Sequence, residues 1–451
     1  MKLPAYPRYK PSGVEWLGDV PEHWEVKRLK WVGEAVIGLT YSPTDVVDEG
    51  EGTLVLRASN IQGGRIVLDD NVFVSAEIPR KLRTKANDIV ICTRNGSRDL
   101  VGKTGKISER ESGLTFGAFT AVFRSSANDY MFYVFNSGLF SFQAGLYQTS
   151  TIFQLTNGTI NAFQIPLPPP REQQAIAAFL DRETGRVDQL LAKKRELIER
   201  LKEKRTALIS NTVARGLPPA AARAAGFPEN PPLKPSGLDW LRDIPKHWEV
   251  KSLTRLTLAI RNGTSATQLD DTDNTVPVTR IESISGGRIN FDKVGQVEWT
   301  PSIEGFRLKK GDILLSHINS LSMVGNCALF DSDQPLYSGM NLLRIQPERT
   351  IHAPWLWRVI SSDGIRKEIS ARAKPAINQA SVTTTQIKSL RLPVPPLAEQ
   401  SAIAAYLDDE TAKLDALVGK VEVAVERLQE HRTALITAAV TGKIDVRKAA
   451  A

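Results

Sequence analysis

The chain has 451 residues, of which 41% are hydrophobic and 24% are charged, and its formal net charge is +8. This length exceeds one ordinary hydrophobic core, so we expect several structural units with the composition of a soluble globular protein. No stretch is apolar enough for a signal peptide or a membrane span, and Cys92 and Cys327 lack metal-site spacing, so we expect a cytoplasmic protein whose basic charge favours a polyanion such as nucleic acid.

The beginning of the chain recurs near its middle. Lys10–Leu17 reads KPSGVEWL and Lys234–Leu241 reads KPSGLDWL. Each copy continues into a Pro-x-His-Trp-Glu segment, which contains His23 and Trp24 in the first copy. The sequence therefore contains one module twice, and we expect the repeated tryptophans to be core or anchor residues and the histidines to be non-catalytic.

Each module continues with short strand-like runs, such as Asp88–Ile91 and Asp312–Leu315, and with helical segments near 129–143 and 354–369. This pattern predicts two mixed α/β domains. The copies share markers such as Gly63–Ile66 and Gly286–Ile289 but diverge between them. We infer a common scaffold that carries two different surfaces.

Polar and basic turns follow several of these predicted strands. Arginine commonly reads guanine in the major groove, asparagine and glutamine read adenine, and lysine or arginine also hold phosphates. The same residue types are common in any turn, so a purely structural role stays open for each of them. The candidate DNA-binding residues are Arg57, Asn60, Arg65, Arg94, Asn95, Ser97, Arg98, Thr151, Gln154, Arg280, Ser283, Arg288, His317, Asn319, Asn378 and Gln379.

A proline-rich segment and a long helical pattern close each module. From Glu172 to about Val213 the chain has no proline, and its apolar residues follow the alternating spacing of a coiled coil. Each helix alone would expose an apolar stripe, so we expect the two to pair antiparallel, with Ile176 near Leu435. The predicted seam residues are Ile176, Leu180, Val187, Leu190, Leu197, Leu201 and Leu208 in the first helix and Ile403, Leu407, Leu414, Leu417, Val421, Leu428 and Leu435 in the second.

Glu183 and Glu410 take equivalent positions in this predicted seam. They are either helix-edge carboxylates or polar residues that fix the register of the pair.

The expected fold is therefore α+β, with two globular α/β domains alternating with two long helices that form an antiparallel coiled coil. The predicted boundaries are 1–165 for the first domain, 166–216 for the central helix, 217–233 for a linker, 234–392 for the second domain and 393–451 for the C-terminal helix.

Two apparent enzyme motifs fail on inspection. Gly102-Lys103-Thr104 ends like a phosphate-binding loop, but the required earlier glycine is replaced by Ser97. Asn230–Leu233 is similar to the Asn-Pro-Pro-aromatic motif of adenine methyltransferases, but it ends in leucine and follows no predicted strand. We therefore expect a chain without catalytic residues, without a metal site and without a bound cofactor.

The doubled layout, the segment PLPPPREQ at Pro166–Gln173 with its copy PVPPLAEQ at Pro393–Gln400, and the long helices that follow resemble the specificity subunit of type I restriction–modification systems. The resemblance implies that each domain reads one half of a split site in double-stranded DNA, and that the helices fix the gap between the halves. It also implies two methyltransferase and two restriction/translocase partner subunits, to which S-adenosylmethionine, ATP and Mg²⁺ belong. The divergent domain interiors favour an asymmetric target. A stand-alone bipartite DNA-binding or scaffold protein is the alternative, which neighbouring methyltransferase and nuclease genes would exclude.

Overall fold

The computed structural model of the chain describes residues 4–97, 100–146, 154–270, 274–376 and 379–447. They form two compact units: unit 1 comprises Met1–Arg195 and Glu422–Ala451, and unit 2 comprises Glu196–Val421. Two long helices, α4 (Pro170–Arg215) and α9 (Leu397–Val440), contribute to both units. Within the described ranges, no helix is both long and apolar enough to span a membrane.

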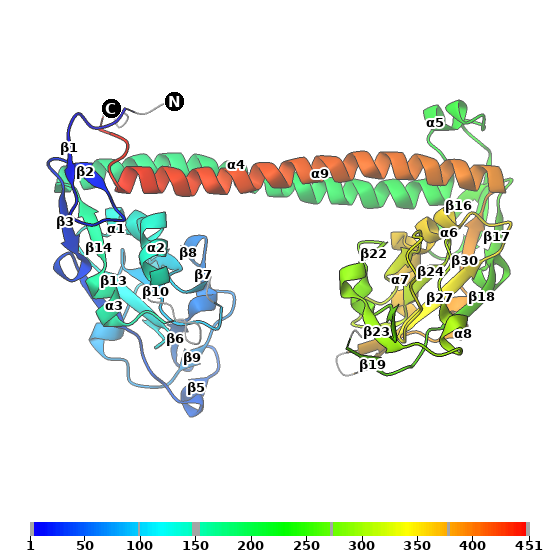
Figure 1. Ribbon diagram of the computed structural model, residues 1–451, viewed down its shortest axis with the longest axis horizontal. Helices are drawn as coiled ribbons and strands as arrows, with labels where there is room; N and C mark the ends of the chain where they lie inside the picture. Colours follow the sequence, from blue (N-terminus) through cyan, green and yellow to red (C-terminus); the bar gives the residue numbers. More distant parts are fainter. Residues whose placement is uncertain (1–3, 98–99, 147–153, 271–273, 377–378, 448–451) are drawn as a thin grey trace. The chain divides into compact units, whose positions relative to one another are not determined.

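Unit 1 is built on a mixed sheet of six strands (Figure 1), in the order β4 (Glu34–Ile37), β13 (Thr120–Arg124), β10 (Ile89–Cys92), β11 (Thr104–Lys106), β8 (Gly64–Ile66) and β7 (Ile61–Gln62). All four side chains of β10 are buried, because this apolar strand lies in the middle of the sheet. The remaining strands of the unit are β1 (Tyr9–Pro11), β2 (Asp19–Pro21), β3 (Glu25–Arg28), β5 (Val46–Val47), β6 (Thr53–Leu56), β9 (Phe73–Val74), β12 (Thr115–Phe116) and β14 (Gln164–Leu167).

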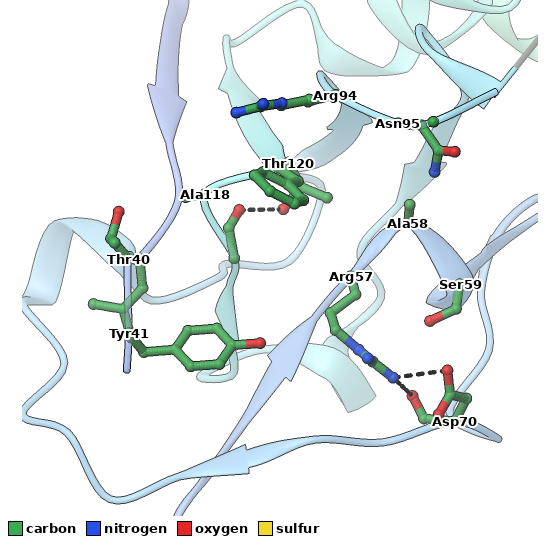
Figure 2. A pocket seen from close by; sticks show the side chains of 14 residues that line it. Thr40, Tyr41, Arg57, Ala58, Ser59, Asp70, Arg94, Asn95, Ala118 and Thr120 are labelled. Atoms are coloured by element: carbon green, nitrogen blue, oxygen red, sulfur yellow. Dashed lines mark hydrogen bonds and ion pairs between the residues drawn. The ribbon is translucent and has the colours of Figure 1, made fainter. Parts of the chain in front are cut away.

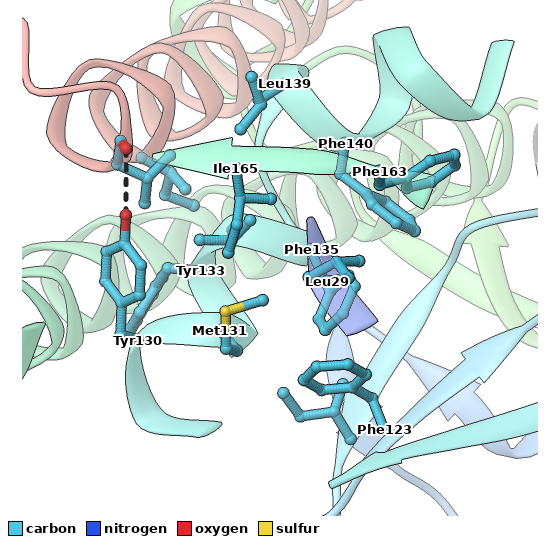
Figure 3. Close-up of a cluster of buried hydrophobic side chains, with 14 of the residues drawn as sticks. Leu29, Phe123, Tyr130, Met131, Tyr133, Phe135, Leu139, Phe140, Phe163 and Ile165 are labelled. Atoms are coloured by element: carbon cyan, nitrogen blue, oxygen red, sulfur yellow. Dashed lines mark hydrogen bonds between the residues drawn. The ribbon is translucent and has the colours of Figure 1, made fainter. Parts of the chain in front are cut away.

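An aromatic core joins this sheet to the helices α1 (Asn128–Phe135), α2 (Gly138–Leu146) and α3 (Asn157–Ala162). Figure 3 shows Phe123, Phe135, Phe140 and Phe163 in this core, and successive rings meet edge to face. The Tyr130 hydroxyl donates to the carbonyl oxygens of Pro166 and Val440, at 2.9 and 3.1 Å. The strand β14 that leads into α4, and the end of α9, are therefore fixed to the core of unit 1.

Unit 2 repeats the plan with a four-stranded antiparallel sheet, in the order β18 (Thr257–Asn262), β27 (Leu342–Pro347), β24 (Ile313–Ser316) and β26 (Cys327–Leu329). Its helices are α5 (Pro219–Ala224), α6 (Ala353–Ile360), α7 (Asp363–Arg372) and α8 (Thr384–Lys388). The other strands are β15 (Leu233–Leu238), β16 (Leu241–Pro245), β17 (Glu249–Ser252), β19 (Gln268–Leu269), β20 (Thr275–Val278), β21 (Ile284–Ser285), β22 (Arg288–Ile289), β23 (Gly295–Glu298), β25 (Ile318–Asn319), β28 (Lys374–Ala376), β29 (Gln379–Ser381) and β30 (Arg391–Val394).

In unit 1, the Pro-x-His-Trp-Glu segment is hydrogen-bonded to the start of α4. The buried indole of Trp24 donates from Nε1 to Glu172 Oε1 at 3.1 Å, and His23 Nε2 lies 2.8 Å from Glu172 Oε2. Glu172 belongs to the first turn of α4 and is itself buried, so these partners compensate its loss of hydration.

Unit 2 repeats this cluster. Trp248 Nε1 donates to Glu399 Oε2 at 3.0 Å, and His247 Nε2 lies 2.8 Å from the same oxygen. The tryptophans are therefore the core anchors that the sequence predicts, and the histidines help to hold the first turn of each long helix.

The long helices run antiparallel, as predicted. In unit 1, Asp188 of α4 pairs with Arg432 of α9 at 2.9 Å, and Ile176 packs in the same core as Leu435. In unit 2, Arg205 pairs with Asp415 at 2.9 Å. As the residue numbers increase along α4, the numbers of their partners on α9 decrease.

The predicted seam is wrong at Leu190, Leu197 and Leu417. Leu190, Leu197 and Leu417 are 48%, 42% and 47% exposed, whereas the following residues Leu191 and Ile198 are only 6% and 8% exposed. The error arises because two apolar residues stand side by side at these points, and periodicity alone does not choose between them. The other predicted seam residues are buried or half-buried.

Buried threonines occupy the seam beside the two glutamates. The Thr184 and Thr411 hydroxyls donate to the carbonyl oxygens of Leu180 and Leu407, each at 2.6 Å, and so enter the seam without an unpaired polar group. Glu183 and Glu410 instead pair with basic residues of their own helices, as helix-edge carboxylates do.

Candidate nucleic-acid interface

A cavity of about 790 Å³ opens in unit 1 where β6 and β10 end and β13 begins (Figure 2). Its lining includes three of the predicted residues, Arg57, Arg94 and Asn95. It also includes two aromatic residues that the sequence did not single out, Tyr41 and Phe119. The strand ends thus gather cationic, amide and aromatic side chains at one place.

Arg94 and Phe119 are held together through backbone and side chain. The backbone N–H groups of Thr93 and Arg94 both donate to the carbonyl oxygen of Phe119, at 2.9 and 3.1 Å. The Arg94 guanidinium lies 5.0 Å from the centre of the Phe119 ring, a cation–π distance. Both residues are exposed, Phe119 by 58%, so the stacked pair faces solvent.

Arg57 lies in the same cavity but is engaged by a carboxylate. One of its guanidinium nitrogens lies 2.7 Å from an Asp70 carboxylate oxygen and 3.2 Å from the Asp70 carbonyl oxygen (Figure 2). This ion pair compensates the charge of Arg57 and fixes the loop that carries Asp70.

The structure gives Asn60 and Ser283, two of the predicted DNA contacts, a role inside the fold. Both side chains are fully buried. Asn60 accepts from the backbone N–H of Arg57 at 2.9 Å, and Ser283 accepts from that of Arg280 at 2.8 Å. Each side chain closes a short helical turn, and this structural need explains a polar residue at that position.

His317 is another predicted DNA contact, and its side chain is buried at 7% exposure. This burial lowers the pKa of the imidazole, which favours the neutral ring. Its backbone carbonyl accepts from the N–H of Val382 at 2.9 Å, so the residue belongs to the interior of unit 2.

Asn95 and Asn319 stand at the same place after β10 and β24, and part of each side chain is used locally. Asn95 Oδ1 accepts from the backbone N–H of Ser97 at 3.0 Å, and Asn319 Oδ1 accepts from that of Ser320 at 2.8 Å. These bonds fix the turns that follow the two strands.

The remaining predicted residues that the structure describes are exposed. Arg65 lines a second cavity of unit 1, of about 520 Å³, together with Lys106 and Asp188. The other exposed candidates are Ser97, Gln154, Arg280, Arg288 and Gln379. Arg98, Thr151 and Asn378 lie outside the described residues.

Phe119 is the most informative residue that sequence reasoning missed. It follows Gly117 and Ala118 in a turn just before β13, and an aromatic residue beside small ones in a turn was the available signal. Its importance comes from Arg94, which is distant in sequence and reaches it through the pairing of β10 with β13.

The 790 Å³ cavity of unit 1 supplies a cationic donor, one exposed and one half-buried aromatic ring, and hydroxyl groups. These groups suit contacts to phosphates, base edges and base planes. Among the described residues, no group of three or more histidine, cysteine or acidic side chains is placed to hold a metal ion.

A family model described as "Type I restriction modification DNA specificity domain" matches residues 21–200 and 245–427. The MjaX specificity subunit of Methanocaldococcus jannaschii is 38% identical over 201 residues, which are 43% of this chain and 45% of that one. The type I restriction enzyme EcoKI specificity subunit of Escherichia coli is 24% identical over 440 residues, which are 95% of this chain and 90% of that one.

A solved structure is also similar in fold. It is described as "Structural basis underlying complex assembly and conformational transition of the type I R-M system", and the similarity covers 93% of this chain and 98% of that one. The TM-score is 0.66 at 17% sequence identity, so the two chains share a fold.

Proposed function

Because this chain belongs to the DNA specificity family of type I restriction–modification systems, we propose that its two units read the two unlike halves of one split DNA target. The chain is a specificity subunit with two target-recognition domains, which in this family is a non-catalytic component. It would act in the cytoplasm on double-stranded DNA.

One observation carries the proposal: equivalent strand ends bear different side chains in the two units. Arg94 stands two residues after β10, and Ile318 stands two residues after β24. Phe119 directly precedes β13, where Asn341 directly precedes β27. Two units that share a scaffold but carry different side chains at their strand ends are suited to two different base sequences.

The exposed leucines of the long helices support a second role, in docking the methyltransferase subunits. Leu190 and Leu197 are one heptad apart on α4, and Leu417 takes the position of Leu190 on α9. Large apolar side chains on the outer face of a helix favour a protein partner. We infer two methyltransferase and two restriction/translocase partners, which would supply the sites for S-adenosylmethionine, ATP and Mg²⁺.

The paired helices also suit a measuring role. α4 and α9 have 46 and 44 residues, and each is one uninterrupted helix. A helix of fixed length resists bending far better than a flexible linker. We infer that the helix pair sets the number of base pairs between the half-sites.

The test is a selection from a library of random duplexes by the full chain in complex with its methyltransferase subunits. We expect one split motif with two unlike halves and a fixed spacer. The purified chain alone should bind DNA without methylating it. S-adenosylmethionine-dependent methylation by the chain alone, or selection of a single continuous motif, would contradict the proposal.

A further inference from the structure

The cavity of unit 1 contains two arginines in different electrostatic states. Among the residues that line it, Arg57 is paired with Asp70, and these two charges compensate each other. Arg94 makes no ion pair with any residue that the structure describes. Of the two arginines that line the cavity, Arg94 is therefore the one without a carboxylate partner among the described residues, and we take its partner to be a group that reaches the cavity from outside.

The position of Arg94 is fixed before any partner arrives. Its backbone N–H is bonded to Phe119, and its backbone also forms an isolated bridge with Gln154. The Phe119 ring covers one face of the guanidinium, so fewer side-chain rotamers remain to be lost on binding. Among the described residues, no side chain accepts a hydrogen bond from the guanidinium edge, so its N–H donors can meet a planar acceptor.

Resting on the proposed function, we propose that this cavity reads a guanine of the half-site bound by unit 1. Arg94 donates in pairs to the guanine O6 and N7 atoms in the major groove. Phe119 is a positioning residue that acts through Arg94. Arg57 and Asp70 shape the wall of the cavity without reading a base.

The choice of guanine follows from the arrangement of donors and acceptors. Guanine presents two neighbouring acceptors in the major groove, which match the fork of the guanidinium. Adenine and cytosine each present an amino group there, which would face the N–H donors of Arg94 unfavourably. Thymine offers one acceptor beside a methyl group, so only one of the two hydrogen bonds would form.

A phosphate contact by Arg94 is the competing outcome, and it has a different signature. Loss of a phosphate contact weakens binding to all sequences alike. It also lowers the slope of the logarithm of the binding constant against the logarithm of the salt concentration by about one. Loss of a base contact changes the preferred base at one position and leaves the salt dependence almost unaltered.

The experiment uses the full chain with its methyltransferase subunits in the same duplex selection, followed by binding titrations at several salt concentrations. Two variants change Arg94: Arg94→Lys keeps the charge and removes the planar fork, and Arg94→Ala removes both. Phe119→Leu keeps apolar bulk and removes the ring. Arg110→Ala is the matched control, because Arg110 is exposed in unit 1 and does not line the cavity. Thermal unfolding of each variant checks that the fold is intact.

We expect Arg94→Lys to reduce the preference for guanine by about 10- to 100-fold at one position of one half-site. The other half-site should remain unchanged. Phe119→Leu should weaken the same preference at the same position by a smaller factor, and Arg110→Ala should alter no position.

The inference is overturned if the wild type selects no guanine in either half-site, or if Arg94→Lys leaves every base preference intact. It is also overturned if Arg94→Ala weakens all duplexes equally with a lower salt slope. These results would leave the proposed function standing as long as the wild type selects a split site. A wild type without a split site would instead remove the proposed function itself.

Discussion

Unit 1 and unit 2 have similar hydrogen bonds at the first turns of the long helices, here called the roots. They carry different side chains at the ends of their strands. At the roots, Glu172 and Glu399 each receive an indole N–H and a histidine nitrogen. At the strand ends, the stacked pair of Arg94 and Phe119 in unit 1 is replaced by unrelated side chains in unit 2. The difference separates two tasks: buried polar clusters fix the frame, and exposed residues on that frame are free to vary.

The root clusters allow the strongest test of the shared frame. Replacing Glu172 with alanine leaves buried donors without acceptors, and we expect a loss of about 3–5 kcal/mol in unfolding free energy. Glu399→Ala should cost less, about 2–3 kcal/mol, because Glu172 also accepts from the Tyr6 hydroxyl in unit 1. Calorimetric unfolding measures both.

The conservative changes Glu172→Gln and Glu399→Gln keep one acceptor each. They should therefore lower the unfolding free energy by less than the alanine changes. Negligible losses for the two alanine variants would show that the clusters do not stabilise the helix roots, and equal losses would exclude the extra contribution of Tyr6.

The corrected seam is tested by two neighbouring residues of α4. Ile198→Ala removes a buried side chain, and we expect it to cost about 2–4 kcal/mol. Leu197→Ala removes an exposed one and should cost less than about 1 kcal/mol. Denaturant unfolding compares the two, and the reverse order would restore the register predicted from the sequence.

Leu197→Ala should instead weaken binding of the methyltransferase partner, if the exposed leucines dock it. Unchanged binding of that partner would remove Leu197 from the docking surface.

How far the sequence predicts this structure depends on whether a feature is local. The repeat, the proline-rich segments and the apolar spacing predicted the two long helices and their antiparallel pairing. The exact seam was missed, because Leu190–Leu191 and Leu197–Ile198 each offer two apolar residues and only packing chooses one. The roles of the histidines and of Glu172 could not be predicted from the sequence either, because their hydrogen bonds join distant segments.

The sequence singled out some residues of the candidate interface and not others. Arg94 was singled out because a basic turn follows a strand. Asn60 and Ser283 have the same polar character but close buried turns, and composition does not distinguish the two roles. Phe119 was missed because its position beside Arg94 depends on the pairing of two strands.

A smaller effect is expected in the pH dependence of stability, and it arises from a residue in the interior of unit 2. Burial lowers the pKa of His317, so the unfolded chain binds a proton at this residue more readily than the folded chain. The stability that this group contributes is present above about pH 6.5 and is lost as the pH falls below it. Stability curves between pH 7.5 and about 5 should therefore be shallower for His317→Gln than for the wild type. Parallel curves would exclude the effect.

The most direct test of the account removes one heptad from each long helix, Lys194–Arg200 and Lys420–Glu426, and sequences the DNA methylated by the resulting complex. Seven residues keep the seam in register and shorten each helix by about 10 Å, which corresponds to about three base pairs. The account predicts the same two unlike half-sites with a spacer about three base pairs shorter. An unchanged spacer, or altered bases in the half-sites, would contradict it.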